Sequence, residues 1–232
     1  MAYRLSPTAL ELFKECQRCF WYDRKGGIPR PRGIFPSLPG GYDRVTKDYF
    51  DVFRRKGEMP PEEPFAELGG QGYRFFPDAH RLAVWRDART AGIEWFDEKR
   101  NRFFGALDDL LENTNTNKVA VFDVKTKGKE PQDDATKWNV DQMSAYAFLL
   151  QKNGFEVEDE AILAYYCPER INPDVLRIEH GIKILRVKVD PEAALERFEN
   201  ALCVLESPAP PPASEDCASC DWLKKRAEAE GR

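Results

Sequence analysis

An acid and a lysine stand two residues apart at the end of an apolar run, VAVFDVKTKGKEP, at residues 119–131. Side chains alternate between the two faces of a β-strand, so Asp123 and Lys125 would emerge on one face. Asp108 lies on the preceding predicted strand, and its carboxylate could meet that of Asp123 over one Mg²⁺. Lys125 could then orient or deprotonate a water that attacks a phosphodiester bond. The alternative is a solvated strand end that carries an incidental charge pair.

Two further polar residues could reach the same place. Gln142 and Tyr146 lie on a helix predicted near 136–153, which ends at Asn153-Gly154. They are four residues apart and therefore share one face of that helix.

The six cysteines divide into two groups. Cys16 and Cys19 form one CxxC pair, and Cys217 and Cys220 form another near the opposite end of the chain. This spacing lets both thiolates of a pair bind one ion. A Cys₄ metal site shared by the two pairs is therefore predicted, and the alternative is two unrelated pairs. The remaining two stand in apolar surroundings and are predicted to be buried packing residues: Cys167 and Cys203. A CxxC redox protein is disfavoured, because neither pair lies in a thioredoxin-like βαβ context.

The elements that must position these residues alternate between helix and strand. The chain predicts a hairpin with Asp108 late in its first strand, and two further strands with a loop between them. Helices are predicted at 6–22, 42–56, 80–91, 136–153, from Pro191 to 207, and at 221–230. Prolines and glycines predict an irregular connection over 26–41, which passes the basic residues Arg24, Lys25, Arg30 and Arg32. The pattern is that of an α/β (α+β) protein.

The composition is that of an ordinary globular chain of 232 residues with a net charge of −5. This charge argues against binding nucleic acid by bulk electrostatics, but it allows an enzyme with one basic groove. Lys118, Lys127 and Lys129 could contact phosphates there, or they could be solvated surface charges. No run of 18 apolar residues and no signal peptide is present, so a cytoplasmic protein without a membrane association is expected.

Three short segments together carry a resemblance to a known family. GALDD (105–109), DVKT (123–126) and QMSAY (142–146) resemble, in this order, the motifs of PD-(D/E)XK nucleases of the RecB type. The opening segment SPTALELFKECQRCFWY is similar to the first helix of the CRISPR-associated Fe–S exonucleases and of the AddB helicase–nuclease arm. The resemblance implies one domain over 1–232 with a restriction-endonuclease-like core at about 92–200, in which helices flank a mixed central sheet. The Cys₄ site would join the segments 1–25 and 205–232.

The same resemblance implies roles for individual residues. Asp108, Asp123 and the carbonyl of Val124 would hold Mg²⁺ or Mn²⁺, and Lys125 would be the catalytic lysine. Gln142 and Tyr146 would position DNA and that lysine. The four paired cysteines would hold a 4Fe–4S cluster, with Zn²⁺ as the alternative that their spacing also allows.

Two departures from the family pattern stand out. Relatives usually carry a histidine on a helix upstream of the first aspartate, whereas the helix GGYDRVTKDYF offers Asp43, Lys47 or Asp48 instead. The two histidines, His80 and His180, do not fall at that position. Relatives also commonly divide the cluster cysteines one and three, whereas this chain divides them two and two.

Two functions from different classes fit these observations. The first is a metal-dependent deoxyribonuclease, exonuclease-like, that acts on single-stranded DNA or duplex ends and works with helicase, CRISPR or repair proteins. The second is a catalytically inactive nucleic-acid-binding or scaffold module of the same fold. The intact Asp108, Asp123 and Lys125 favour the first, and the missing histidine favours the second.

Overall fold

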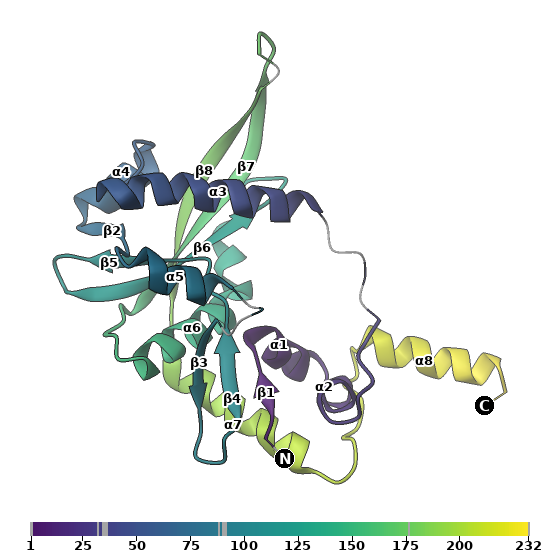
Figure 1. Cartoon of the computed structure of the whole chain (residues 1–232). Helices are drawn as coiled ribbons and strands as arrows, with labels where there is room; N and C mark the ends of the chain where they lie inside the picture. The colour runs from purple at the N-terminus through teal and green to yellow at the C-terminus, as the bar shows by residue number, and fades with distance from the viewer. Residues whose placement is uncertain are drawn as a thin grey trace.

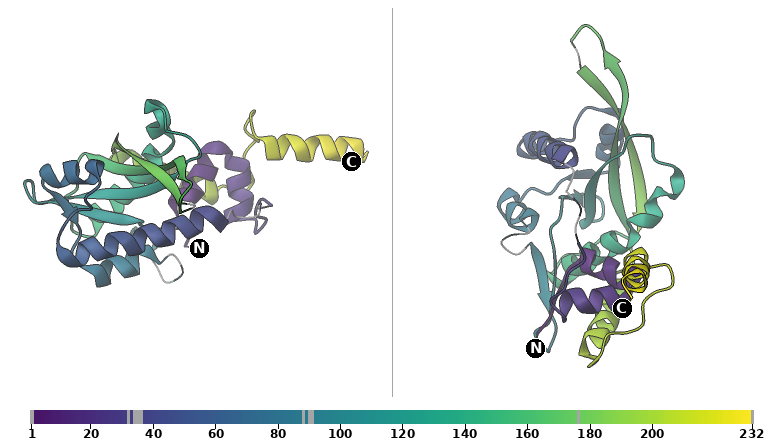
Figure 2. Two further views of the ribbon diagram at one scale, coloured as in Figure 1. Left: turned by 90° about the horizontal axis from the view of Figure 1, so that it is seen from above. Right: turned by 90° about the vertical axis from the view of Figure 1, so that its right-hand side faces the viewer.

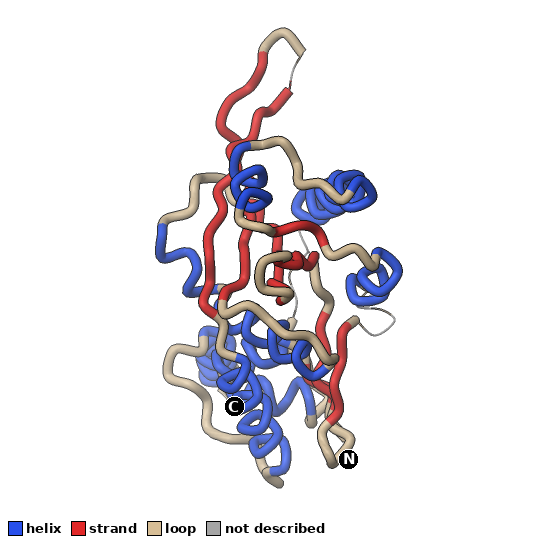
Figure 3. The backbone as a smooth tube through the Cα atoms, turned by 90° about the vertical axis from the view of Figure 1, so that its left-hand side faces the viewer, coloured by secondary structure: helices blue, strands red, loops and turns tan. Residues whose placement is uncertain are grey.

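The computed structural model describes residues 2–31, 33, 37–87, 89, 92–175 and 177–231, so that Arg32 of the basic connection lies outside the described residues. A twisted sheet forms the middle of the molecule, and helices lie on both sides of its strands (Figures 1 and 3). This is the mixed α/β architecture predicted from the sequence, and it is consistent with a restriction-endonuclease-like core.

The central sheet has five strands in the order β2-β5-β6-β7-β8. Its strands are β2 (Tyr73–Phe75), β5 (Asp109–Asn113), β6 (Lys118–Thr126), β7 (Glu160–Asn172) and β8 (Arg177–Lys188). β6 and β7 run parallel, while the other three neighbouring pairs are antiparallel. The predicted hairpin is therefore β5–β6, and its turn uses Asn117 at φ 59°, a left-handed conformation that asparagine tolerates better than most residues.

Each face of this sheet packs against its own set of helices. On one face, Phe122 of β6 contacts Phe50 and Phe65, which come from α3 (Ser37–Lys56) and α4 (Glu63–Gly70). On the other face, Val119 and Val121 join the larger core with α6 (Val140–Lys152) and α7 (Pro191–Glu206). Asp123 and Lys125 share the parity of these valines, so the alternation of β6 directs them toward α6.

The N-terminal segment contributes one strand and two helices that pack into the larger core. A second sheet has the order β1-β4-β3 and consists of β1 (Arg4–Leu5), β4 (Arg102–Gly105) and β3 (Ile93–Phe96). The helix predicted over 6–22 is two helices, α1 (Pro7–Glu15) and α2 (Gln17–Arg24). Cys16 separates them in an extended conformation, with φ −159° and ψ 108°. The helical periodicity of the sequence does not predict this break. With Cys16 extended, the thiols of Cys16 and Cys19 both reach one group of four cysteines.

Several predicted boundaries are corrected. α3 begins at Ser37, so residues 37–41 are helical and not irregular; Pro39 fits because amides in the first turn need no helical partner. The helix predicted near 80–91 is α5 (Ala79–Arg86), and residues 88 and 90–91 lie outside the described residues. Asp108 does not lie late in a strand but directly before β5. The helix near 136–153 is confirmed as a 3₁₀ turn, η1 (Asp133–Trp138), followed by α6.

Two elements project from the body. The outer parts of β7 and β8 continue as a two-stranded ribbon past the end of β6, and α8 (Ala218–Ala229) extends away at the C-terminus (Figure 2). None of the described residues of α8 is buried, so its attachment depends on the segment just before it and on the cysteines. Within the described residues, no helix combines the length and the apolar character that crossing a membrane requires.

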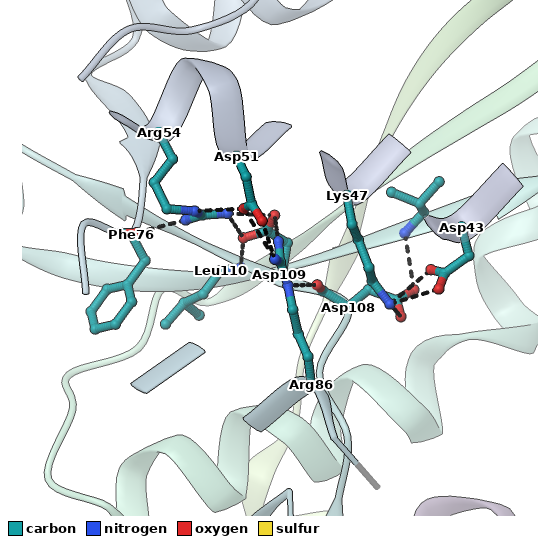
Figure 4. A network of polar contacts seen from close by, with 10 residues as sticks. Asp43, Lys47, Asp51, Arg54, Phe76, Arg86, Asp108, Asp109 and Leu110 are labelled. Carbon is teal, nitrogen blue, oxygen red and sulfur yellow. Dashed lines mark hydrogen bonds and ion pairs between the residues drawn. The ribbon is translucent and has the colours of Figure 1, made fainter. Parts of the chain in front are cut away.

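A buried ion network fixes the start of β5. Asp109 is 1% exposed and accepts hydrogen bonds from Arg54 Nη2 at 2.7 Å and from Arg86 Nη2 at 2.6 Å. Arg86 also donates from Nε to the carbonyl of Asp108 at 2.8 Å, and Asp51 pairs with both arginines (Figure 4). The network therefore ties α3, α5 and β5 together at the residue that precedes β5.

Replacing Arg54 should expose how much this network stabilises the fold. Arg54→Met leaves Asp109 buried with one cation instead of two, and removal of a partner from a buried ion pair typically costs about 3 kcal/mol or more. The free energy of unfolding, measured by urea denaturation, should fall by about that amount. Arg55→Met is the control, because Arg55 is the exposed neighbour on the same helix and its loss should cost less than about 0.5 kcal/mol. Equal effects of the two substitutions would contradict the assignment.

Candidate active site

The structure brings the two predicted acids together at one edge of the hairpin. Asp109 pairs with Phe122 in the register of β5 and β6, so Asp108 and Asp123 fall on neighbouring positions. Asp123 is buried at 2% exposure, and the side chain of Asp108 is 26% exposed. The amide of Val124 lies 3.4 Å from Asp108 Oδ2. Two carboxylates and a backbone segment with a carbonyl, that of Val124, thus gather at one point.

Lys125, Gln142 and Tyr146 form a chain of contacts on the same side. Lys125 Nζ lies 2.6 Å from Asp123 Oδ2 and donates to Gln142 Oε1 at 3.2 Å. Gln142 Nε2 in turn donates to the hydroxyl of Tyr146 at 3.2 Å. Gly105 is required beside this chain, because a Cβ built on it would lie 2.6 Å from Tyr146 Cε1. All five predicted residues therefore meet, while their catalytic roles remain predictions.

Burial and like charge shape the electrostatics of the acids. Burial, followed by the charge of Asp108, raises the pKa of Asp123 to about 7, although Lys125 opposes this. Burial alone would lower the pKa of Lys125, but the carboxylate of Asp123 outweighs it and the pKa is raised. The site therefore gathers negative charge that its own lysine only partly offsets.

The upstream helix α3 brings a lysine to the acid pair. Lys47 Nζ lies 3.0 Å from Asp108 Oδ1 and 2.8 Å from Asp43 Oδ1 (Figure 4). Asp48, the third candidate on this helix, is exposed. His80 is also exposed, and His180 pairs with Tyr42, 2.6 Å from its hydroxyl. The sequence offered Lys47 and Asp43 as candidates on this helix, but the contact of Lys47 with Asp108 spans 61 residues and has no signal in the sequence.

The acidic site suits a divalent cation. Among the described residues, the buried Asp123 Oδ2 has no hydrogen bond of acceptable geometry, although the ammonium of Lys125 lies close to it. Carboxylate and carbonyl oxygens are the donors that Mg²⁺ and Mn²⁺ prefer. Asp108, Asp123 and the carbonyl of Val124 thus offer a donor set that fits such an ion.

The four paired cysteines also meet, and they join the N- and C-terminal segments. Their Sγ atoms all lie within 4.8 Å of one another. The Sγ of Cys19 is 3.7 Å from that of Cys217 and 3.5 Å from that of Cys220, and Cys16 Sγ is 3.9 Å from Cys220 Sγ. Arg30 Nη2 donates to Cys217 Sγ at 3.0 Å. Such a closely spaced thiolate set could bind a metal.

The two remaining cysteines behave differently from each other. Cys167 is buried and donates to the carbonyl of Lys129 at 3.2 Å, as a packing residue can. Cys203 is exposed, so the prediction that it is buried is wrong. It lies on α7 between residues that face the core, and its apolar neighbours in the sequence belong to a different face of that helix.

The sequence matches the family model of the PD-(D/E)XK nuclease superfamily over residues 38–224, and the chain belongs to this superfamily. This membership suggests a nuclease that uses a divalent metal and acts on nucleic acid. No curated protein matches the sequence significantly. One similar solved structure is described as "Crystal structure of SSO0001"; it shares 15% sequence identity and a TM-score of 0.30 over 88% of this chain and 78% of that chain.

The stability of the metal-free protein should depend on the protonation of Asp123. Its raised pKa means that the folded state holds this proton more tightly than the unfolded state, so the stabilisation is complete below about pH 4 and is lost as the pH rises toward about 7. Urea denaturation in EDTA across this range should show a decline for the parent that is smaller for Asp123→Asn. Parallel curves for the two proteins would contradict the assignment. Asp48→Asn, at an exposed acid, should follow the parent.

Removal of one paired cysteine should release the metal of the cysteine site. Cys16→Ala and Cys217→Ala should each lose bound metal, lower the melting temperature and make the C-terminal segment more sensitive to protease, because a structural metal contributes directly to folding. Elemental analysis, thermal melting and limited proteolysis measure these three effects. Cys167→Ala and Cys203→Ala are the controls and should keep the metal. A Cys16→Ala protein with the parent's metal content would show that the four do not form one centre.

Proposed function

We propose that the protein is a Mg²⁺- or Mn²⁺-dependent nuclease that hydrolyses phosphodiester bonds of DNA. The observation that carries the proposal is the meeting of Asp108, Asp123 and Lys125 in a buried, charged site within a chain of this superfamily. A binding module has no need of a partly buried lysine that is paired with one acid and lies within electrostatic reach of a second.

The residues of the chain divide the work. Asp108, Asp123 and the carbonyl of Val124 would hold the divalent ion, which when bound would lower the pKa of a water and offset charge on the phosphate. Lys125 keeps its ammonium beside the site and can donate to the attacking water or to a phosphate oxygen. Gln142 holds Lys125 in place, and Tyr146 holds Gln142. Mispositioning Lys125 would therefore cost rate even with the acids intact.

The finer assignments rest on the resemblance. An exonuclease-like action on single-stranded DNA or duplex ends, a RecB-type or CRISPR-associated subgroup, helicase or repair partners and a cytoplasmic location are part of the proposal. So is a single domain over 1–232. Lys127 and Lys129 follow β6 directly and are exposed, which supports phosphate contacts beyond the catalytic strand.

Two metal centres are considered for the cysteine site: an iron–sulfur cluster and a single Zn²⁺ ion. The resemblance supports a 4Fe–4S cluster. The sulfur separations support a single ion, because tetrahedral thiolates at the usual Zn–S bond length of about 2.3 Å lie about 3.8 Å apart. A cluster with four irons between the cysteines needs the sulfurs farther apart. On this observation we favour Zn²⁺; absorption near about 400 nm in anaerobically purified protein would instead identify iron and sulfur.

A catalytically silent module remains the second candidate. One observation favours it: Lys47 pairs with Asp108 at the side where relatives usually provide a histidine ligand. A nuclease assay of the parent chain with Mg²⁺ and Mn²⁺, on single- and double-stranded DNA, separates the two candidates. Absence of cleavage under all these conditions would favour the silent module.

Loss of Lys125 should separate catalysis from binding. Lys125→Ala should lower the rate of DNA cleavage by about 10²- to 10⁴-fold, the range typical of a positioned acid–base or electrostatic group. Nucleic-acid binding and the metal content of the cysteine site should stay near those of the parent. Lys99→Ala is the matched control, because Lys99 is exposed and pairs with Glu206 on α7. A Lys125→Ala protein as active as the parent would overturn the catalytic assignment.

A further inference from the structure

Lys47 occupies an unusual place for a helix-borne lysine. Its side chain is only 19% exposed, and its ammonium bridges Asp43 of the same helix and Asp108 of the acid pair. Asp43 precedes it by one helical turn, so α3 presents both groups toward the start of β5. Figure 4 shows the contacts of this ammonium with both carboxylates.

Each acid of the pair Asp108 and Asp123 has one lysine as its counterion. Lys125 contacts Asp123, and Lys47 contacts Asp108. Arg86 does not serve Asp108 in this way, since its Nε donates to the backbone carbonyl and its Nη2 to Asp109. Among the described residues, Lys47 is therefore the cation that forms an ion pair with the Asp108 carboxylate.

A divalent cation held by Asp108 and Asp123 would conflict with this arrangement. An ammonium 3.0 Å from a carboxylate oxygen lies within the space around a metal bound to that carboxylate, where two positive charges repel strongly. This repulsion weakens the contact of Lys47 with Asp108, while its second partner Asp43, at 2.8 Å, keeps the ammonium at the edge of the site. The anion that arrives there in the proposed reaction is the phosphodiester.

We propose that Lys47 is a phosphate-binding residue of the substrate site that acts as the counterion of Asp108 while the metal is absent. This inference rests on the proposed function and deepens it, because it assigns a substrate contact to a residue of the helix on which the resemblance leads us to expect a histidine. Lys47 accordingly competes with the divalent ion in the empty enzyme and assists the substrate in the loaded one. Its removal has opposite effects on these two steps.

Two binding measurements without turnover test the proposal. In the first, Mn²⁺ is titrated into the DNA-free protein. Lys47→Met should bind Mn²⁺ about tenfold more tightly than the parent, because one competing cation is gone. In the second, a short single-stranded oligonucleotide is titrated in Ca²⁺, a cation that commonly replaces Mg²⁺ with little turnover. Lys47→Met should bind it about tenfold more weakly, because a phosphate contact is lost.

The controls make each outcome decisive. Lys56→Met removes an exposed lysine from the same helix and should leave both affinities unchanged. Lys47→Gln keeps a hydrogen-bond donor for Asp43 and is measured in parallel, in case the methionine variant does not fold. Unchanged or weaker Mn²⁺ binding in the Lys47 variants would overturn the counterion role. Unchanged oligonucleotide binding in the Lys47 variants would overturn the phosphate role. If Mn²⁺ binding were weaker both in the Lys47 variants and in Asp43→Asn, the result would instead identify α3 as a source of metal ligands.

These measurements stay informative if the proposed function fails. A parent chain that binds Mn²⁺ and oligonucleotide but cleaves neither single- nor double-stranded DNA would refute the nuclease, while the effect of Lys47 on both affinities would still be measured. A cleaving parent with unaltered affinities in the Lys47 variants would refute the inference alone.

Discussion

The arrangement of the molecule depends on holding two carboxylates close together where water is scarce. Asp108 and Asp123 repel each other, and burial of Asp123 adds a further cost to its charge. Each acid has a lysine against it, one from its own strand and one from α3. The β5–β6 hairpin brings the acids together and supplies Lys125 as the cation for Asp123, while the cation for Asp108 comes from outside the hairpin.

The helices α3 and α5 supply cations to two adjacent acids, Asp108 and Asp109, which make different contacts. Asp108 turns toward the site, while Asp109 is buried and binds Arg54 and Arg86. Arg86 also donates to the carbonyl of Asp108, so the network around Asp109 fixes the backbone that presents Asp108 to the site. The same helix, α3, carries Arg54 into the network and Lys47 into the site. Stability and charge compensation are thus supplied by one element.

Local periodicity made much of this site predictable. The alternation of β6 places Asp123 and Lys125 on one face, and the helical turn aligns Gln142 with Tyr146. The contacts that could not be predicted are those made across long stretches of chain, as between Lys47 and Asp108. The break at Cys16 and the exposure of Cys203 were missed for a related reason. Both depend on which tertiary surface a helix meets, and the apolar pattern of a short segment does not specify that surface.

The cysteine site and the acid site are mechanically connected through α1. The cysteines join the start of α2 to the start of α8, and α2 follows α1 after the single extended residue Cys16. Lys14 of α1 forms an ion pair with Asp141 of α6 at 2.8 Å, one residue before Gln142. The pKa of Glu11 on α1 is raised by burial and lowered in part by Lys125, which places that helix within electrostatic reach of the lysine. A metal at the cysteines would therefore stabilise the N- and C-terminal segments and, through α1, the position of α6.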